Sequence, residues 1–213
     1  MSTKTYKMIN FFKKIFNQTE KKPKMNNSFL QSILQKSKDN KEIISIWQYN
    51  GDKGSLVGYV SDISEEYIGF KHFTRFGKQD GILYIKQANI KNIDFNDDYT
   101  KVMECLIQYA DIIHKSPDFR IDLNQSDFWQ FNAVIQLSKA KDQIASFEIN
   151  GNEFFTGFVK ETSEEDFILN CVAKNGEDLG TSLFRIEDIT EIRVNDLDDR
   201  RKLLLYKWRK AIL

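Results

Sequence analysis

The clearest chemical pattern in the chain is a stretch that interleaves aromatic and basic side chains, FKHFTRFGK at residues 70–78. Aromatic rings stack on nucleotide bases while cations hold phosphate, so this composition predicts a contact with single-stranded RNA. The candidate contact residues are Phe70, Lys71, His72, Phe73, Arg75 and Lys78. A β-strand with buried apolar and solvated basic residues would show the same pattern, and the sequence leaves both interpretations open.

Residue groups that carry out catalysis are not recognisable in this sequence. It has no phosphate-binding loop, no Gly-x-Ser-x-Gly, no His-Glu-x-x-His and no Cys-x-x-Cys. The two histidines, His72 and His114, are isolated, and Cys105 and Cys171 have no partner at metal-ligand spacing. We therefore expect a non-enzymatic protein with no catalytic residue, no metal site and no cofactor. Its thiols are expected to be reduced and buried, as in the cytoplasm.

The N-terminal segment, residues 1–25, holds seven lysines against one glutamate. A helix over residues 8–17 would present an apolar stripe with two lysines outside it. The candidate contact residues are Met8, Ile9, Phe12, Lys13, Lys14, Ile15 and Phe16. Such a helix is typical of the interface of an anionic membrane, which predicts a peripheral position at the inner membrane face. Docking on the rest of the chain and disorder are the alternatives.

The phrase VGYVSDISEEYIGF at residues 57–70 returns as TGFVKETSEEDFIL at residues 156–169. Pairs at an offset of 99 include Gly58 with Gly157, Gly81 with Gly180 and Asp97 with Asp196. Before Gly58 the offset becomes 100, with Asn50-Gly51 falling on Asn150-Gly151, which predicts a one-residue insertion in a hairpin turn. A period near 100 is too long for a solenoid and indicates two tandem domains.

Each copy is predicted to contain five short strands, with a helix before and after them. β-Branched and aromatic runs followed by Asn-Gly indicate hairpins, and apolar residues at helical spacing flank each set. The predicted fold class is therefore mainly β with flanking helices, α+β. Pro117 ends the helix between the copies. The predicted domains are a basic tail at 1–25, a first domain at 26–115 and a second at 116–213.

The stretches GYVSDISEEYIGF with ANIKNIDF, and GFVKETSEEDFIL with EDITEIRV, resemble the Sm-like small β-barrels, in particular the bacterial Sm-like RNA chaperones. The resemblance implies two five-stranded Sm-like or SH3-like barrels that associate through their edge strands. In RNA-binding members the loops after strands two and four hold nucleotides. Here the first of these loops holds Glu65-Glu66 and Glu164-Glu165, and Glu187-Asp188 replaces the basic histidine motif. No RNA-binding residue is therefore transferred from the family.

Charge is unevenly distributed along the chain. Residues 142–198 hold four Lys/Arg against fourteen Asp/Glu, whereas residues 43–99 hold six against eight. Residues 199–213 hold six basic residues against one acid, and this basic helix is expected to lie on the acidic second domain or to bind an external anion. The predicted function is a binding scaffold for a protein partner or for self-association. A single-stranded RNA binder using residues 70–78 and a membrane adaptor using the N-terminal helix are the alternatives.

Overall fold

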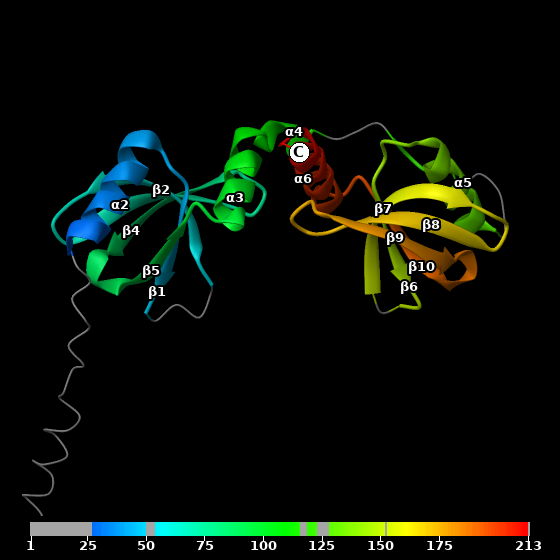
Figure 1. Cartoon of the computed structure of the whole chain (residues 1–213), viewed down its shortest axis with the longest axis horizontal. Helices are drawn as coiled ribbons and strands as arrows, with labels where there is room; N and C mark the ends of the chain where they lie inside the picture. Colours follow the sequence, from blue (N-terminus) through cyan, green and yellow to red (C-terminus); the bar gives the residue numbers. More distant parts are fainter. Residues whose placement is uncertain (1–26, 50–53, 116–118, 123–127, 152, 213) are drawn as a thin grey trace, which may run out of the picture.

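The computed structural model describes residues 27–49, 54–115, 119–122, 128–151 and 153–212. These residues form two similar halves, each with a five-stranded antiparallel sheet and flanking helices (Figure 1). The predicted α+β class, with two sheets of five strands and helices on either side of each, is confirmed. No helix within the described ranges is long and apolar enough to cross a membrane.

The first half runs through α2 (Asn27–Asn40), β1 (Ile44–Gln48), β2 (Leu56–Ile63), β3 (Tyr67–Phe73), β4 (Gln79–Lys86), the 3₁₀ turn η1 (Gln87–Asn89), β5 (Ile90–Phe95), α3 (Asp98–Gln108) and α4 (Ala110–His114). The second half runs through α5 (Trp129–Lys139), β6 (Ala145–Ile149), β7 (Glu153–Thr162), β8 (Asp166–Val172), β9 (Asp178–Arg185), η2 (Ile186–Asp188), β10 (Ile189–Val194) and α6 (Leu197–Ile212). The strand orders are β4-β3-β2-β1-β5 and β10-β6-β7-β8-β9, so the two sheets have the same topology.

Neither sheet closes into a barrel, so the prediction of Sm-like barrels is wrong. In the described strands, β4 and β5 are the two edges of the first sheet, and β9 and β10 are the edges of the second. The hairpin signals in the sequence specify which neighbouring strands pair. They carry no information on whether the two outer strands also pair with each other. Only the resemblance to Sm-like proteins implied this contact, which would close the barrel.

Strand register corrects the alignment of the two repeats at their first strands. Ser45 pairs with Val57, and Ser146 pairs with Thr156. Since Val57 and Thr156 differ by 99 positions while Ser45 and Ser146 differ by 101, the first repeat is two residues longer between these strands. The predicted one-residue insertion is therefore wrong, because the first strands of the two repeats are offset by 101 positions rather than 100.

Both halves turn from the last strand into the following helix in the same way. Asn96 and Asn195 each adopt a φ of +61°, a left-handed conformation that asparagine tolerates. The next residue then caps the helix: Asp97 Oδ1 accepts a bond of 2.8 Å from the Thr100 amide. Asp196 Oδ1 does the same for the amide of Asp199, at 2.7 Å. The repeated Asn-Asp pair thus sets where the strand ends and where the helix begins.

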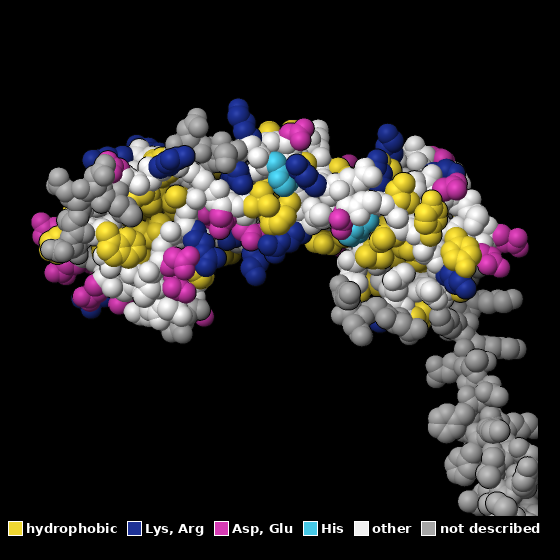
Figure 2. Space-filling view, turned by 180° about the vertical axis from the view of Figure 1, so that it is seen from behind, with side chains coloured by type: hydrophobic (Ala, Val, Ile, Leu, Met, Phe, Trp, Pro, Cys, Tyr) yellow, Lys and Arg dark blue, Asp and Glu magenta, His cyan; other side chains and the backbone are white. Residues whose placement is uncertain are grey.

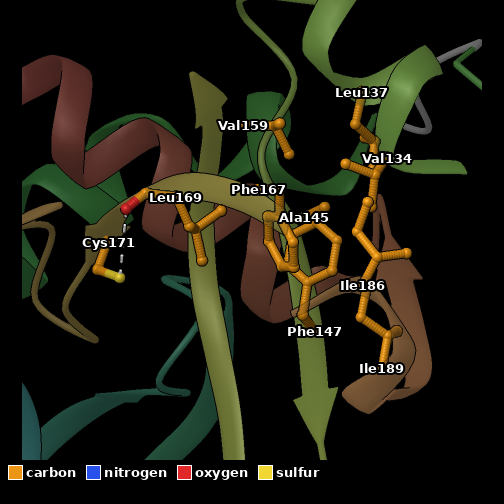
Figure 3. Close-up of a cluster of buried hydrophobic side chains, with 10 residues drawn as sticks. All are labelled: Val134, Leu137, Ala145, Phe147, Val159, Phe167, Leu169, Cys171, Ile186 and Ile189. Atoms are coloured by element: carbon orange, nitrogen blue, oxygen red, sulfur yellow. Dashed lines mark hydrogen bonds between the residues drawn. The ribbon is translucent and has the colours of Figure 1, made fainter. Parts of the chain in front are cut away.

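Each sheet buries one face against the helix that precedes it. In the first half, α2 covers a core that includes Leu34, Ile46, Ile68 and Phe70. In the second half, Val134 and Leu137 of α5 cover a core that includes Phe147 and Phe167, whose ring centroids lie 5.0 Å apart (Figure 3). Tight apolar packing on this face explains why the strands alternate in part between buried and exposed residues.

A shared helical layer, formed by α3, α4 and α6, lies between the two sheets (Figure 1). Its buried side chains come from both repeats: Val57, Val102, Met103, Cys105, Leu106, Ile113 and Leu205. Residues from both sides of the predicted boundary at 115/116 thus build one apolar cluster. The domain limits remain a prediction, but the two halves do not have fully separate cores.

The hairpin loop of each half also contacts the first turn of the helix in the other half. In the first loop, Arg75 Nη2 lies 3.1 Å from Asp198 Oδ2 at the start of α6. In the second loop, Asn175 Nδ2 donates to Asp98 Oδ2 at 3.4 Å, at the start of α3. Arg209 Nη2 donates to both carboxylate oxygens of Asp98, at 2.8 and 2.7 Å, and lowers the pKa of this carboxyl.

The close approach of each hairpin to its own helix generates the first prediction. A Cβ on Gly176, whose φ is +83°, would lie 2.5 Å from both C and Cβ of Leu205. Gly180 lies in the same hairpin with a φ of +82° and has nothing within 4 Å of its Cβ position. We expect Gly180→Ala to cost about 1 kcal/mol, from backbone strain alone, and Gly176→Ala to cost about 3 kcal/mol or more. Equal losses in urea unfolding would contradict this packing.

Candidate functional site

The aromatic residues of the stretch at 70–78 lie largely inside the protein. The Phe70 side chain is 0% exposed and belongs to the core under α2. Phe73 is also buried, with its ring 5.8 Å from the ring of Tyr59. Neither ring is available to stack on a base while the sheet is folded. Phe70 and Phe73 therefore cannot make the base contacts that the sequence suggested.

The basic residues of the same stretch have different surroundings. His72 Nδ1 lies 3.4 Å from Asp80 Oδ2, and the Arg75 guanidinium lies over the ring of Phe76, 4.6 Å from its centroid. Lys78 is exposed in the loop before β4. Lys71 is the member that projects from the outward face of the sheet, and the structure brings it together with residues outside the predicted set.

The outward face of the first sheet gathers tyrosine and lysine side chains. The register places Tyr59 opposite Lys71 and Lys71 opposite Ile82 across β2, β3 and β4, while Tyr67 lies opposite Lys86. Residues directly opposite one another point to the same side of a sheet. We define the tyrosine–lysine face by these positions and Tyr84: Tyr59, Tyr67, Lys71, Ile82, Tyr84 and Lys86.

Aromatic rings and ammonium groups lie close together on the tyrosine–lysine face. Lys71 Nζ lies 5.5 Å from the ring centroid of Tyr59, and Lys86 Nζ lies 5.6 Å from that of Tyr67. Gly69 lies between Tyr84 of β4 and Asp62 of β2, and the side chains of Ser61 and Asp62 lie against it between the two lysine–tyrosine pairs. The Tyr84 side chain is 76% exposed, and that of Ile82 is 50% exposed. The face is therefore open at Ile82 and Tyr84, and it holds two lysines beside one carboxylate, Asp62, which lies 3.4 Å from Lys38 Nζ.

Side chains from β7 and α6 show why the equivalent face of the second sheet differs. Phe158 stands at the position of Tyr59, and the ring of Tyr206 from α6 covers it at a centroid distance of 5.1 Å. In the first half, α3 ends at Gln108 and the chain turns at Tyr109 into α4. The residue of α3 equivalent to Tyr206 is Ile107, whose side chain has no ring. At this position of the described helices, an aromatic side chain covers the outward face of the second sheet, and an isoleucine stands in its place in the first half.

The two halves also differ in the charge that they present. The six positions of the tyrosine–lysine face include two lysines, and Asp62, opposite Gly69, adds one carboxylate beside them. Figure 2 shows a group of hydrophobic side chains on the first half, at the right, with Lys/Arg and Asp/Glu side chains around it. The equivalents of Tyr67, Lys71 and Tyr84 in the second sheet are Asp166, Asn170 and Leu183.

The face escaped the sequence-based search because its residues are not consecutive. In β3 they are Tyr67 and Lys71 with Gly69 between them, and in β4 they are Ile82, Tyr84 and Lys86, all at a spacing of two. The search favoured a continuous aromatic–basic run, in which alternate residues point into the core. Reading the predicted strands at period two would have separated Phe70 from Lys71 and assigned the tyrosines to one face.

The basic C-terminal helix is largely engaged inside the molecule. Lys210 Nζ lies 3.0 Å from Asp178 Oδ2, and Arg201 Nη1 donates to the carbonyl of Lys174 at 2.9 Å. Arg209 binds Asp98 of the first half, as described above. These contacts support the interpretation that the basic residues of α6 pair with acidic residues of the same molecule. One of these ion pairs, Arg209 with Asp98, reaches the first half.

A second cluster of polar side chains is buried beneath α6. Ser146 Oγ donates to Asp199 Oδ1 at 2.6 Å and also contacts Thr156 Oγ1 at 2.6 Å. Lys202 Nζ donates to Thr156 Oγ1 at 2.6 Å. Asp199 is 0% exposed, so no substrate reaches this group. The first repeat has Ser45, Val57 and Thr100 at the equivalent positions, so this carboxylate network belongs to the second half alone.

The cysteines and the N-terminal candidates add no further site. Cys105 and Cys171 are buried free thiols, and burial raises the pKa of Cys105 to about 11. In the part of the chain that the structure describes, no three His, Cys, Asp or Glu side chains group as metal ligands. Met8, Ile9, Phe12, Lys13, Lys14, Ile15 and Phe16 lie outside the described residues.

Comparisons with protein-family models, curated proteins and solved structures find no match for this chain. They therefore give no support to the Sm-like resemblance. What the coordinates define is a two-repeat α+β protein with a shared helical layer and one open aromatic sheet face.

The buried carboxyl generates a prediction on pH and stability. Burial, together with the nearby charges of Asp196 and Asp198, raises the pKa of Asp199 from 3.8 to about 7, against the opposing effects of the Ser146 hydrogen bond and Lys202. The folded protein thus holds a proton that the unfolded chain loses between about pH 4 and 7. The free energy of unfolding should fall as pH rises through this window, by at most about 1.4 kcal/mol per pH unit.

Asp199→Asn should remove this contribution. In urea unfolding at pH 4.5, 6.0 and 7.5, the stability of the wild type relative to Asp199→Asn is expected to decrease steadily. Asp142→Asn, at an exposed carboxylate that does not act on Asp199, is the control and should follow the wild-type slope. Parallel pH profiles for the wild type and Asp199→Asn would show that Asp199 does not titrate in this window.

Proposed function

We propose that this chain is a non-enzymatic protein that binds single-stranded nucleic acid on the tyrosine–lysine face of its first sheet. The observation that carries the proposal is the grouping of three tyrosine rings and two lysines on one open sheet surface. Exposed rings on a sheet provide platforms for unpaired bases, and each base adds a stacking contribution that does not depend on its identity. The lysines lie where the phosphates between stacked bases would pass.

The geometry supports single strands rather than a duplex. The bases of a duplex are stacked on one another, and their faces are not available to tyrosine rings. Tyr84 is the most exposed of the three rings, and it stands at the edge strand β4 where a flexible strand can approach. Tyr59 and Tyr67 lie further into the sheet, each beside a lysine ammonium group. A single strand crossing from β4 toward β2 would meet ring, cation and ring in turn.

The second sheet provides the comparison within the same molecule. It has the same topology, but Leu183 replaces Tyr84, Asn170 replaces Lys71 and Tyr206 covers Phe158. Its strands also belong to the segment with fourteen acidic residues against four basic ones. Phosphate would be repelled there, so the proposal assigns nucleic-acid binding to the first half only.

A protein partner is the second candidate function, and one observation favours it. β4 is an edge strand of the described sheet, and it carries the exposed side chains of Ile82 and Tyr84. A strand of a partner could extend the sheet at this edge through main-chain hydrogen bonds. Such a complex would have weak dependence on salt, whereas nucleic-acid binding would weaken steeply as salt rises.

Fluorescence anisotropy with labelled 20-nucleotide single strands of RNA and DNA tests the proposal. Tyr84→Ala should weaken binding by about 5- to 150-fold, the equivalent of about 1–3 kcal/mol for one stacked base. Lys71→Ala should reduce the slope of log affinity against log salt by about 0.7. Both substitutions are at the surface, and circular dichroism should show an unchanged fold.

Leu183→Ala and Asn170→Ala are the matched controls, since they change the equivalent positions of the second sheet. They should leave the affinity unchanged. Absence of binding to random-sequence RNA and DNA in 50 mM salt would overturn the proposal and leave the protein partner as the function to test. Equal losses in the two sheets would also overturn it, because binding would then not depend on the tyrosine–lysine face.

A further inference from the structure

A second open surface lies on the far side of the molecule from the shared helical layer, between α5 and the β7–β8 turn. It is a groove of about 810 Å³. We call it the acidic groove, and the residues that define it are Phe128, Phe131, Glu164, Glu165, Arg185 and Glu187. The Phe128 side chain is 70% exposed at its rim. An exposed ring beside an open depression is a feature of surfaces that bind apolar side chains.

Negative charge surrounds this apolar patch. Three glutamates line the groove, and the single arginine, Arg185, is already paired, with Nη2 2.9 Å from Glu187 Oε1. Among the described residues that line the groove, no further cation balances Glu164 and Glu165. The groove is suited to an occupant that combines aromatic or aliphatic side chains with lysine or arginine.

The equivalent place in the first half is bridged by side chains. Gln31 Nε2 of α2 donates to Gln87 Oε1 at 2.7 Å, and Gln87 Nε2 donates to the carbonyl of Ser64 at 2.7 Å. This chain of bonds connects the helix to the β2–β3 turn. Ile186 occupies the position of Gln87 in the second half, with its amide bonded to Glu165 as that of Gln87 is to Glu66. An isoleucine side chain cannot form the bridge, which leaves the groove open.

The chain itself contains a segment with the complementary composition. Residues 8–17 read MINFFKKIFN, and residues 1–25 hold seven lysines against one glutamate. On a helix, Met8, Phe12 and Ile15 would share one apolar stripe, with Lys13 and Lys14 beside it. Its aromatic side chains match the groove around Phe128, and its lysines match Glu164 and Glu165.

We infer that the N-terminal segment of one copy of this chain docks in the acidic groove of a second copy. The second copy is required because α2, where the segment joins the described residues, and α5 lie at opposite ends of the molecule, with both sheets between them (Figure 1). The ten residues from 17 to 26 span at most about 35 Å when fully extended. A groove on a neighbouring molecule is reached without crossing the whole length of the same chain.

Such a contact uses different surfaces on the two copies, so every open assembly keeps one free segment at one end and one free groove at the other unless a ring closes. Self-association would therefore increase with concentration rather than stop at a dimer. Because lysine–glutamate attraction at an exposed groove is screened by ions, the association should weaken as salt is raised. It depends on residues remote from the tyrosine–lysine face.

Sedimentation velocity of the full-length protein at increasing concentration tests this inference. The wild type should exceed its monomer mass of 25.0 kDa in 50 mM salt and approach it in 500 mM salt. Glu164→Lys/Glu165→Lys should remain monomeric, and so should Lys13→Glu/Lys14→Glu. A mixture of these two variants should associate again, because the first retains a native segment and the second a native groove.

The matched control is Glu65→Lys/Glu66→Lys, which makes the same change in the bridged turn of the first half and should associate like the wild type. Tyr84→Ala should also associate normally, which separates this inference from the proposed nucleic-acid binding. A wild type that stays monomeric at all concentrations overturns the inference, as does a control that dissociates equally. Co-sedimentation of that monomer with anionic vesicles, lost in Lys13→Glu/Lys14→Glu, would assign the segment to a membrane instead.

Discussion

Each sheet has two faces, and the helix that precedes it can bury only one of them. The rest of the structure depends on what packs against the other, outward face. α2 and α5 each occupy one face of a sheet. The opposite faces are covered from the shared helical layer, where Leu205 of the second repeat is buried in the same cluster as Val57 and Leu106 of the first. Apolar burial of this kind stabilises the arrangement of the halves and decides which parts of each sheet stay open.

The two repeats have diverged in opposite directions around this common plan. In the first, a short α3 leaves the tyrosine–lysine face open while the Gln31–Gln87 bridge closes the surface beside the leading helix. In the second, Tyr206 covers the outward face while Ile186 leaves the acidic groove open. One topology therefore presents a positive aromatic surface at one end and a negative one at the other.

Local features of the fold were predictable from the sequence, whereas the contacts between distant segments were not. The repeat, the α+β class and the flanking helices follow from periodicity and turn residues that act over a few positions. The strand offset of 101 and the open edges depend on pairing between separate strands, and the sequence alignment could not determine them. Predicting the tyrosine–lysine face requires the alternation of side chains along each strand and also the packing of α3, where Ile107 leaves the face uncovered. The sequence pattern alone therefore identified Lys71 but not Tyr84.

The crossed contacts between hairpin loops and helices have a consequence for the symmetry of the chain. Arg75 of the first loop meets the first turn of α6, and Asn175 of the second loop meets the first turn of α3, so each repeat offers the other the same kind of patch. The same elements meet in both directions, loop against first helical turn, as in the isologous interface of a twofold-symmetric dimer. The contacting residues themselves have diverged, since Lys174 stands at the position of Arg75 and Phe76 at that of Asn175, so a joined pair of repeats can keep a twofold arrangement without keeping identical contacts.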